Sequence, residues 1–131
     1  MPASAEGVSS LPPPLEICGQ ALKESALAGV SQFSHPGEFD LRLRHRRVQV
    51  LRFSKGCSTG VSLTIAPKRT LLVLSRARVP DGRVIAIVIE ATKSGVAHVT
   101  ARRPNGARTI VDVHVAPANP GTGERNEITT G

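Results

Sequence analysis

Residues 42–55 have the most distinctive chemistry in this sequence. Six of them are Arg or Lys and none is a carboxylate. Such a block attracts anions over a Debye length of about 8–10 Å. The residues that we expect to face a partner are Arg42, Arg44, Arg46 and Arg47. On one strand face, Arg42, Arg44 and Arg46 would form a row facing an acidic protein surface or another anionic polymer. The alternative is a charged strand face that only prevents aggregation at a sheet edge.

Two cysteines, Cys18 and Cys57, are the next residues with specific chemistry. Their spacing is neither a CxxC redox motif nor a structural zinc site. We expect a disulfide, which would add about 4 kcal/mol in the chain-entropy model. Two buried free thiols are the alternative. A disulfide favours an oxidising compartment. Since residues 1–10 lack signal-peptide features, we expect the mature part of a protein exported outside the cell or to its envelope.

The histidines do not form a catalytic set in the sequence. The strand register expected for 95–116 places His98 opposite Asp112, but no nucleophile or third metal ligand accompanies this pair. Motifs for phosphate, zinc, calcium or hydrolase chemistry are absent. The only aromatic residues are three phenylalanines, which disfavours stacking on single-stranded nucleic acid or sugars. We therefore expect no enzymatic activity, no cofactor and no metal.

Length and composition favour one domain with tails. The chain has 131 residues, 40% of them apolar, and a formal net charge of +7. It contains no run of eighteen apolar residues, so no membrane span is expected. Residues 1–14 predict a flexible Pro-rich arm, residues 15–116 a folded domain, and residues 117–131 a disordered polar tail.

Most of this domain has the pattern of β-structure. Apolar residues alternate with polar ones over 39–43 and 61–65, and further strands are expected at 48–53, 70–79, 83–91, 95–103 and 107–116. The exception is a short N-terminal helix, whose expected apolar face is Leu15, Cys18, Leu22 and Ala26.

Two turns share one design, Pro-Asp-Gly at 80–82 and Pro-Asn-Gly at 104–106. Each predicts a three-residue hairpin loop with Gly in the left-handed region. With such a loop, the numbers of any two residues that face each other add up to 210 in the second hairpin and to 162 in the first. The second hairpin would pair Ala97 with Val113, Val99 with Val111, and Ala101 with Thr109. The first would pair Val73 with Ile89, Ser75 with Ile87, and Ala77 with Ile85.

The first hairpin is apolar on both sides in this register. The residues of its outer side are Leu72, Leu74, Val84 and Val88. Exposed together, they would mark a protein interface. Covered by the N-terminal segment, they would belong to the core. The sequence leaves both readings open.

The segment GVAHVTA at 95–101 precedes a last strand that ends in Val-His-Val at 113–115. This pattern resembles bacterial immunoglobulin-like domains, in which a strand of the type G-x-A-x-V-T-A precedes one ending V-x-V. The resemblance covers about Leu63 to Ala116 and implies an all-β, antiparallel immunoglobulin-like sandwich. The N-terminal Ile-Cys-Gly and the mid-chain cysteine are also similar to small exported proteins of actinobacteria.

These observations predict a binding module and not an enzyme. We expect an accessory module or subunit of an extracellular or envelope assembly, with a protein partner facing the basic strand. One alternative is a protease inhibitor on the same sandwich, presenting loops 54–60 and 92–95. Another is a basic nucleic-acid-binding protein, whose affinity would fall steeply with salt. The sequence does not define the oligomeric state.

Overall fold

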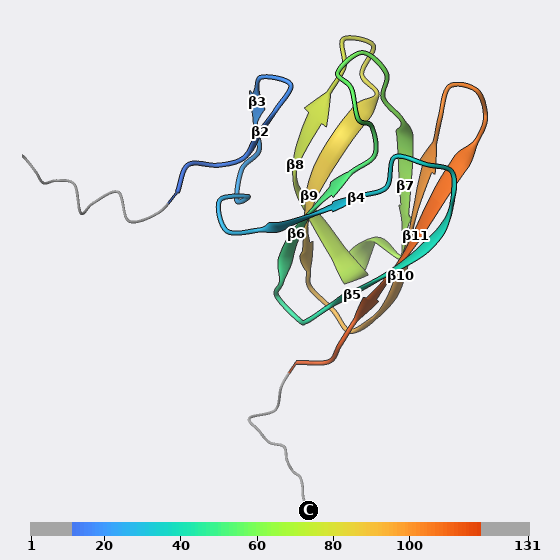
Figure 1. The fold of residues 1–131 in the computed structure, drawn as a ribbon. Coiled ribbons are helices and arrows are strands. Elements are labelled where there is room, and N and C mark those ends of the chain that lie inside the picture. Colours follow the sequence, from blue (N-terminus) through green and yellow to red (C-terminus); the bar gives the residue numbers. More distant parts are fainter. Residues whose placement is uncertain (1–11, 119–131) are drawn as a thin grey trace, which may run out of the picture.

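The computed structural model describes residues 12–118, which form two four-stranded β-sheets packed face to face (Figure 1). The first sheet has the strand order β4 (Gly29–Gln32), β6 (Val48–Arg52), β9 (Val84–Ala91), β8 (Leu71–Arg78). The second has the order β5 (Gly37–Leu43), β11 (Arg108–Val115), β10 (Gly95–Arg102), β7 (Ser62–Ala66). The chain crosses between the sheets after β4, β5, β6, β7 and β9, and such crossings are typical of immunoglobulin-like sandwiches. The predicted fold class is therefore confirmed.

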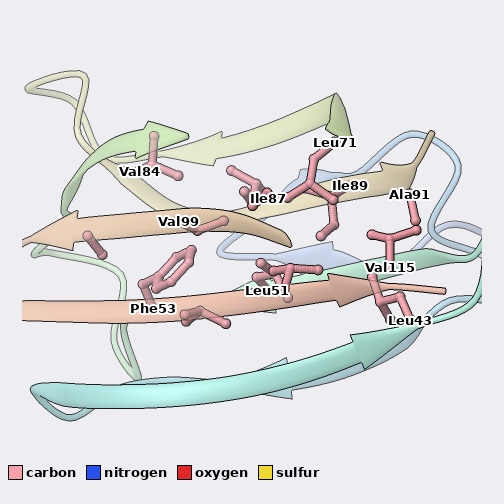
Figure 2. Packing of buried hydrophobic residues seen from close by; sticks show 14 of the residues in the cluster. Leu43, Leu51, Phe53, Leu71, Val84, Ile87, Ile89, Ala91, Val99 and Val115 are labelled. Atoms are coloured by element: carbon pink, nitrogen blue, oxygen red, sulfur yellow. The ribbon is translucent and has the colours of Figure 1, made fainter. Parts of the chain in front are cut away.

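The main core fills the space between the two sheets (Figure 2). Strands β10 and β11 alternate between buried and more exposed residues, so their small and branched side chains face inward. Opposite them, Leu51, Phe53, Ile87 and Ile89 are fully buried. This dry layer is what period-two patterning predicts for facing sheets.

A small hairpin covers the outer face of the first sheet. It consists of β2 (Glu16–Ile17) and β3 (Gln20–Ala21), and it lies beside that sheet in Figure 1. Ile17 and Leu22 are buried there in a second apolar cluster together with Val88. The question about the outer side of the β8–β9 hairpin is thereby answered. Leu74 and Val88 belong to this second cluster, Val84 belongs to the main core, and Leu72 is 50% exposed.

The predicted N-terminal helix is wrong. Cys18 and Gly19 have φ values of 53° and 77°, which are the left-handed values that a type I′ hairpin turn requires. Residues 16–21 therefore turn back on themselves. The only helical element among the described residues is the single 3₁₀ turn η1 (Lys68–Thr70).

The hairpin registers were largely predictable. The β10–β11 pairs agree with the expected sum of 210, Val99 with Val111 among them. In the first hairpin Val73 pairs with Ile89 as expected. An irregularity at Leu74 shifts the pairs of residues 75–77, and a second one restores the expected pair of Arg78 with Val84. The expected partners of Ser75 and Ala77 are therefore wrong, because Ser75 pairs with Val88 and Ala77 with Ala86. Both turns have Gly in the left-handed region, with φ of 92° at Gly82 and 89° at Gly106.

Strand β4 was not predicted, and neither were the two parallel pairings, β4 with β6 and β5 with β11. Most of the expected arm, 1–14, and of the expected tail, 117–131, lies outside the described residues. Within residues 12–118, no helix is long and apolar enough to cross a membrane.

Candidate functional site

Three segments far apart in the sequence meet at one end of the sandwich. They are the β5–β6 turn (44–47), η1 and the β9–β10 loop (92–94). The backbone N–H of Arg46 donates to the carbonyl of Ala91 over 2.7 Å. The hydroxyl of Thr92 donates to the carbonyl of Arg69 over 2.7 Å. The backbone N–H of Thr92 donates to the carbonyl of Thr70 over 3.0 Å. These bonds make one surface, which we call the basic end.

The basic end carries six exposed cations. They are Arg44, Arg46, Arg47, Lys68, Arg69 and Lys93. None of its three segments contains a carboxylate. The nearest one in the chain is Glu90, whose side chain is 21% exposed and lies 3.2 Å from Arg46. This concentration of one charge attracts anionic surfaces, and water screens it only partly at short range.

The predicted site residues lie at or beside this end, but not as predicted. Strand β5 ends at Leu43, so Arg44, Arg46 and Arg47 extend from a turn. The expected row of Arg42, Arg44 and Arg46 along a single strand is therefore wrong. Arg46 has a φ of 71°, which reverses the chain after Arg44. Arg42 is exposed one residue before the end of β5.

Half of the basic end was missed in the sequence. Lys68, Arg69 and Lys93 are isolated in the chain, and only the packing of η1 against the β9–β10 loop brings them beside the arginines. No local sequence pattern predicts that these segments pack together. The one signal was the excess of 17 cations over 10 carboxylates in the whole chain.

Three other loops meet at the opposite end, which we call the turn end. They are 54–60, 79–83 and 103–107. Val61 forms a β-bridge with Val84, and Arg103 Nη1 donates to the carbonyl of Phe53 over 2.9 Å. Loop 92–95, in contrast, belongs to the basic end. The two loops predicted for an inhibitor, 54–60 and 92–95, therefore lie at opposite ends of the sandwich and do not form one surface.

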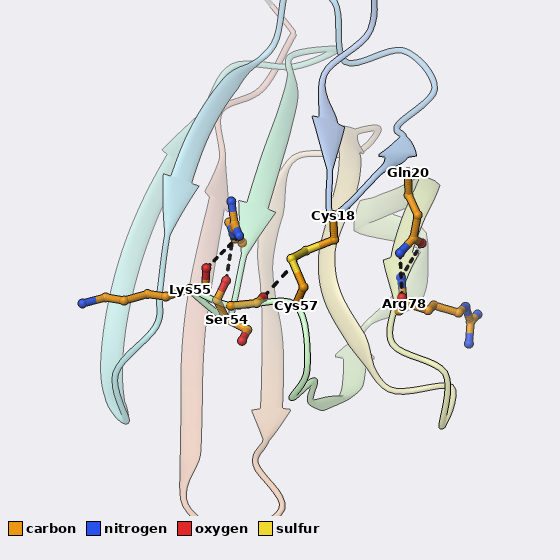
Figure 3. The surroundings of a disulfide bond; sticks show 8 residues. Cys18, Gln20, Ser54, Lys55, Cys57 and Arg78 are labelled. Atoms are coloured by element: carbon orange, nitrogen blue, oxygen red, sulfur yellow. Dashed lines mark hydrogen bonds between the residues drawn. A yellow bond between two sulfur atoms is a disulfide. The ribbon is translucent and has the colours of Figure 1, made fainter.

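The disulfide joins the turn end to the N-terminal hairpin (Figure 3). Cys18 and Cys57 are bonded, with their Cα atoms 5.6 Å apart. On the other side of the hairpin, the amide of Gln20 donates to the carbonyl of Arg78 over 2.7 Å and accepts from its N–H over 2.8 Å. The hairpin is thus fixed at two places, and loop 54–60 is anchored through Cys57.

The outer face of the second sheet carries two histidine–aspartate pairs. His98 Nδ1 lies 2.6 Å from Asp112 Oδ1, as the register predicted, and His114 Nε2 lies 2.9 Å from Asp40 Oδ1. These are cross-strand surface pairs on an open sheet face. Among the described residues, no group of three or more His, Cys, Asp or Glu is placed to hold a metal ion.

Comparison with known proteins adds little to this geometry. No protein-family model matches the sequence. No curated protein matches it either. Among solved structures, the crystal structure of a cysteine protease inhibitor from Entamoeba histolytica is similar, with a TM-score of 0.47 and 13% sequence identity. The similarity covers 69% of this chain and 98% of that chain. At this level, the likeness carries no argument about what this chain does.

Proposed function

We propose that this protein is a non-enzymatic binding module that docks an acidic partner protein on its basic end. One observation carries the proposal. Three hydrogen-bonded segments present six exposed cations, and none of them contains a carboxylate. Guanidinium groups bind carboxylates through two parallel hydrogen bonds, so arginine is well suited to an acidic protein surface. Because the backbone of these segments is already fixed, little ordering would be needed on binding.

We also propose that the module is exported and acts as an accessory subunit of an extracellular or envelope assembly. The disulfide supports this, because such bonds persist in oxidising compartments. Membership of the bacterial immunoglobulin-like family stays a prediction from the pattern at 95–115.

A protein partner is favoured over nucleic acid. The three phenylalanines contact one another, and Phe33 lies 5.5 Å from Phe39 and 6.2 Å from Phe53 between ring centroids. None of them is in the segments of the basic end, so no aromatic side chain there offers a base a surface to stack on. Duplex DNA can bind to a cluster of cations without stacking, so the binding test below includes a DNA duplex.

The test compares two variants of equal net charge. In the basic-end variant, three arginines become serine, namely Arg44, Arg47 and Arg69. The scattered control variant replaces three exposed cations from separate segments outside the basic end, Lys23, Lys55 and Arg108. Arg46 is kept because its guanidinium lies 3.2 Å from the carboxylate of Glu90, and its removal would also unpair that carboxylate.

Immobilised poly-L-glutamate serves as the acidic probe, with a 20-base-pair DNA duplex beside it. We expect the basic-end variant to bind poly-L-glutamate about tenfold more weakly than the parent, from three lost contacts of about 0.2–1 kcal/mol each. The scattered control variant should lose less than threefold. Equal losses in both variants would mean that only net charge matters and would refute the proposal. Tighter binding of the duplex than of poly-L-glutamate at the same salt concentration would favour the nucleic-acid reading.

A second candidate is protease inhibition through the turn end. It is supported by the convergence of loops 54–60, 79–83 and 103–107, which the disulfide and Arg103 hold in place. Rigid loops bind enzymes tightly because little entropy is lost. Inhibition assays against papain-like cysteine proteases and trypsin-like serine proteases test it. Stoichiometric inhibition that is insensitive to salt and unchanged in the basic-end variant would replace the first proposal.

A further inference from the structure

A groove runs between the edges of the two sheets, from Lys68 at the basic end to loop 79–83 at the turn end. Strand β7 is the end strand of the second sheet and β8 that of the first, and the groove between them has a volume of about 1090 Å³. It is a consequence of the fold, because two sheets that share a core face each other at their open edges.

The floor of the groove is apolar. Leu63 and Ile65 of β7 and Val73 of β8 are half-buried and pack against the main core. Fully buried Ile87 also lines the groove. An apolar side chain entering here would therefore contact the core of the protein directly and lose its hydration.

The backbone edge of β7 is free. Strand β7 pairs only with β10, so the peptide groups on its other side have no strand partner. Within residues 12–118, no side-chain hydrogen bond reaches the backbone of residues 62–66. Strand β8 differs, because the Gln20 amide both donates to and accepts from the backbone of Arg78. Gln20 thus occupies the outer edge of β8 at Arg78, the last residue of that strand, whereas no side chain does so along 62–66 of β7.

The rim of the groove is positively charged. Four cations line it, Lys68, Arg76, Arg78 and Arg83. The single carboxylate of the lining is Asp81, which lies 3.3 Å from Arg83 and is already paired. The surplus positive charge selects a ligand with carboxylates.

We propose that this groove binds an extended acidic segment of a partner protein, which adds as a strand to the free edge of β7. Alternate apolar side chains of the segment would enter the groove over Leu63 and Ile65. Its carboxylates would point to the other face of the added strand, and Arg76 and Arg78 at the rim would attract them within a Debye length of about 8–10 Å. Main-chain hydrogen bonds would supply affinity, and the alternation would supply specificity. The surface is distinct from the basic end, with which it shares only Lys68.

The test uses a nine-residue acetylated peptide of alternating Glu and Val as the probe. We expect amide hydrogen exchange to slow by about tenfold or more at saturating peptide at the alternate residues of 62–66 whose N–H groups point away from β10, because those groups become hydrogen-bonded. Amides of the other free edge, residues 37–43 of β5, should not change. A Lys–Val peptide of the same length should bind at least about tenfold more weakly, since the rim repels it.

Two N-methylated isomers of the Glu–Val peptide identify strand addition. Only alternate peptide groups of a strand face the neighbouring strand. Methylation of one alternate set should therefore abolish binding, and methylation of the other set should leave it intact. If both isomers bind like the parent peptide, the contact is only electrostatic and the inference is wrong.

Variants separate this groove from the basic end. The double variant Arg76→Ser, Arg78→Ser should weaken peptide binding by about threefold to tenfold, whereas the basic-end variant should bind the peptide like the parent. Loss of binding in the basic-end variant alone would refute the groove and support the proposed function. Dimerisation of the protein without peptide, with slow exchange at 62–66, would show that a second copy occupies the edge and would also refute the inference.

Discussion

Arg103 places a guanidinium group beneath the turn end without a carboxylate to pair with it. Nη2 donates to the carbonyl of Phe33 over 2.9 Å and to the hydroxyl of Thr109 over 2.8 Å, and Nη1 donates to Phe53. Its buried Nε has no hydrogen-bond partner among the described residues. Only a planar fork reaches acceptors from three segments at once, so this arginine acts as a structural cross-link.

Replacement of Arg103 by methionine should therefore destabilise the fold. The change removes three hydrogen bonds of a charged group and leaves buried carbonyls unpaired, at a cost of about 3 kcal/mol. Urea denaturation followed by circular dichroism measures it. The control is Arg102→Met at the neighbouring exposed position, which should change the free energy of unfolding by less than about 0.5 kcal/mol. Similar effects at both positions would contradict the cross-linking role.

Gly60 allows a close approach of two loops at the turn end. A Cβ there would lie 2.8 Å from the backbone carbonyl carbon of Arg83 and 2.9 Å from the backbone nitrogen of Val84. We expect Gly60→Ala to lower the free energy of unfolding by about 1–3 kcal/mol, because backbone must move. Gly56→Ala in the same loop should be nearly neutral, since nothing lies within 4 Å of its Cβ. Thermal denaturation of both variants would test this contrast, and equal melting temperatures would refute it.

At the scale of elements, the β2–β3 hairpin is the part most dependent on a covalent bond. Each of its strands is two residues long, which is too short for stability without support. Burial of Ile17 and Leu22 and the link from Cys18 to Cys57 provide that support. The hairpin in turn covers an apolar face of the first sheet that would otherwise be exposed.

The double variant Cys18→Ala, Cys57→Ala tests this dependence. A bond that closes a loop of 39 residues should contribute about 4 kcal/mol by restricting the unfolded chain. We expect that loss in urea denaturation, together with increased binding of the dye ANS as the sheet face becomes accessible. If the free energy of unfolding falls by the full amount but ANS does not bind, the disulfide stabilises the fold only by restricting the unfolded chain. Unchanged stability would contradict the role of the disulfide altogether.

Local patterns explain which elements were predictable. Strands β7, β10 and β11 follow period-two alternation, and the Pro-polar-Gly turns determine their own geometry, so the β10–β11 register followed from counting. The irregularity at Leu74 did not, because it depends on packing under the N-terminal hairpin. Strand β4 pairs in parallel with β6, and such non-local pairing leaves no local signature. The helix error arose because helical spacing of a few apolar residues in 15–26 also fits a covered hairpin.

At the scale of the whole molecule, the two ends of the sandwich differ in kind. The turn end is held by the disulfide, Arg103 and Gly60, and its backbone is closely fixed. The basic end collects charge from three parts of the chain. The sequence identified the four arginines at 42–47 but not their lysine and arginine neighbours, because spatial charge density is a property of the tertiary structure. For the same reason, the groove between β7 and β8 had no counterpart in the sequence.

Like charges gathered at one end should reduce stability at low ionic strength. We expect the melting temperature of the parent to rise by about 2–5 °C between 10 and 300 mM sodium chloride, because salt screens this repulsion. In the basic-end variant, with Arg44, Arg47 and Arg69 replaced by serine, the rise should be roughly half as large. The scattered control variant has the same net charge, but its lost cations come from outside the basic end, so its salt response should stay close to that of the parent. Calorimetry without any ligand measures all three proteins. If the two variants respond identically, the repulsion is spread over the whole surface, and the basic end is not an electrostatic unit.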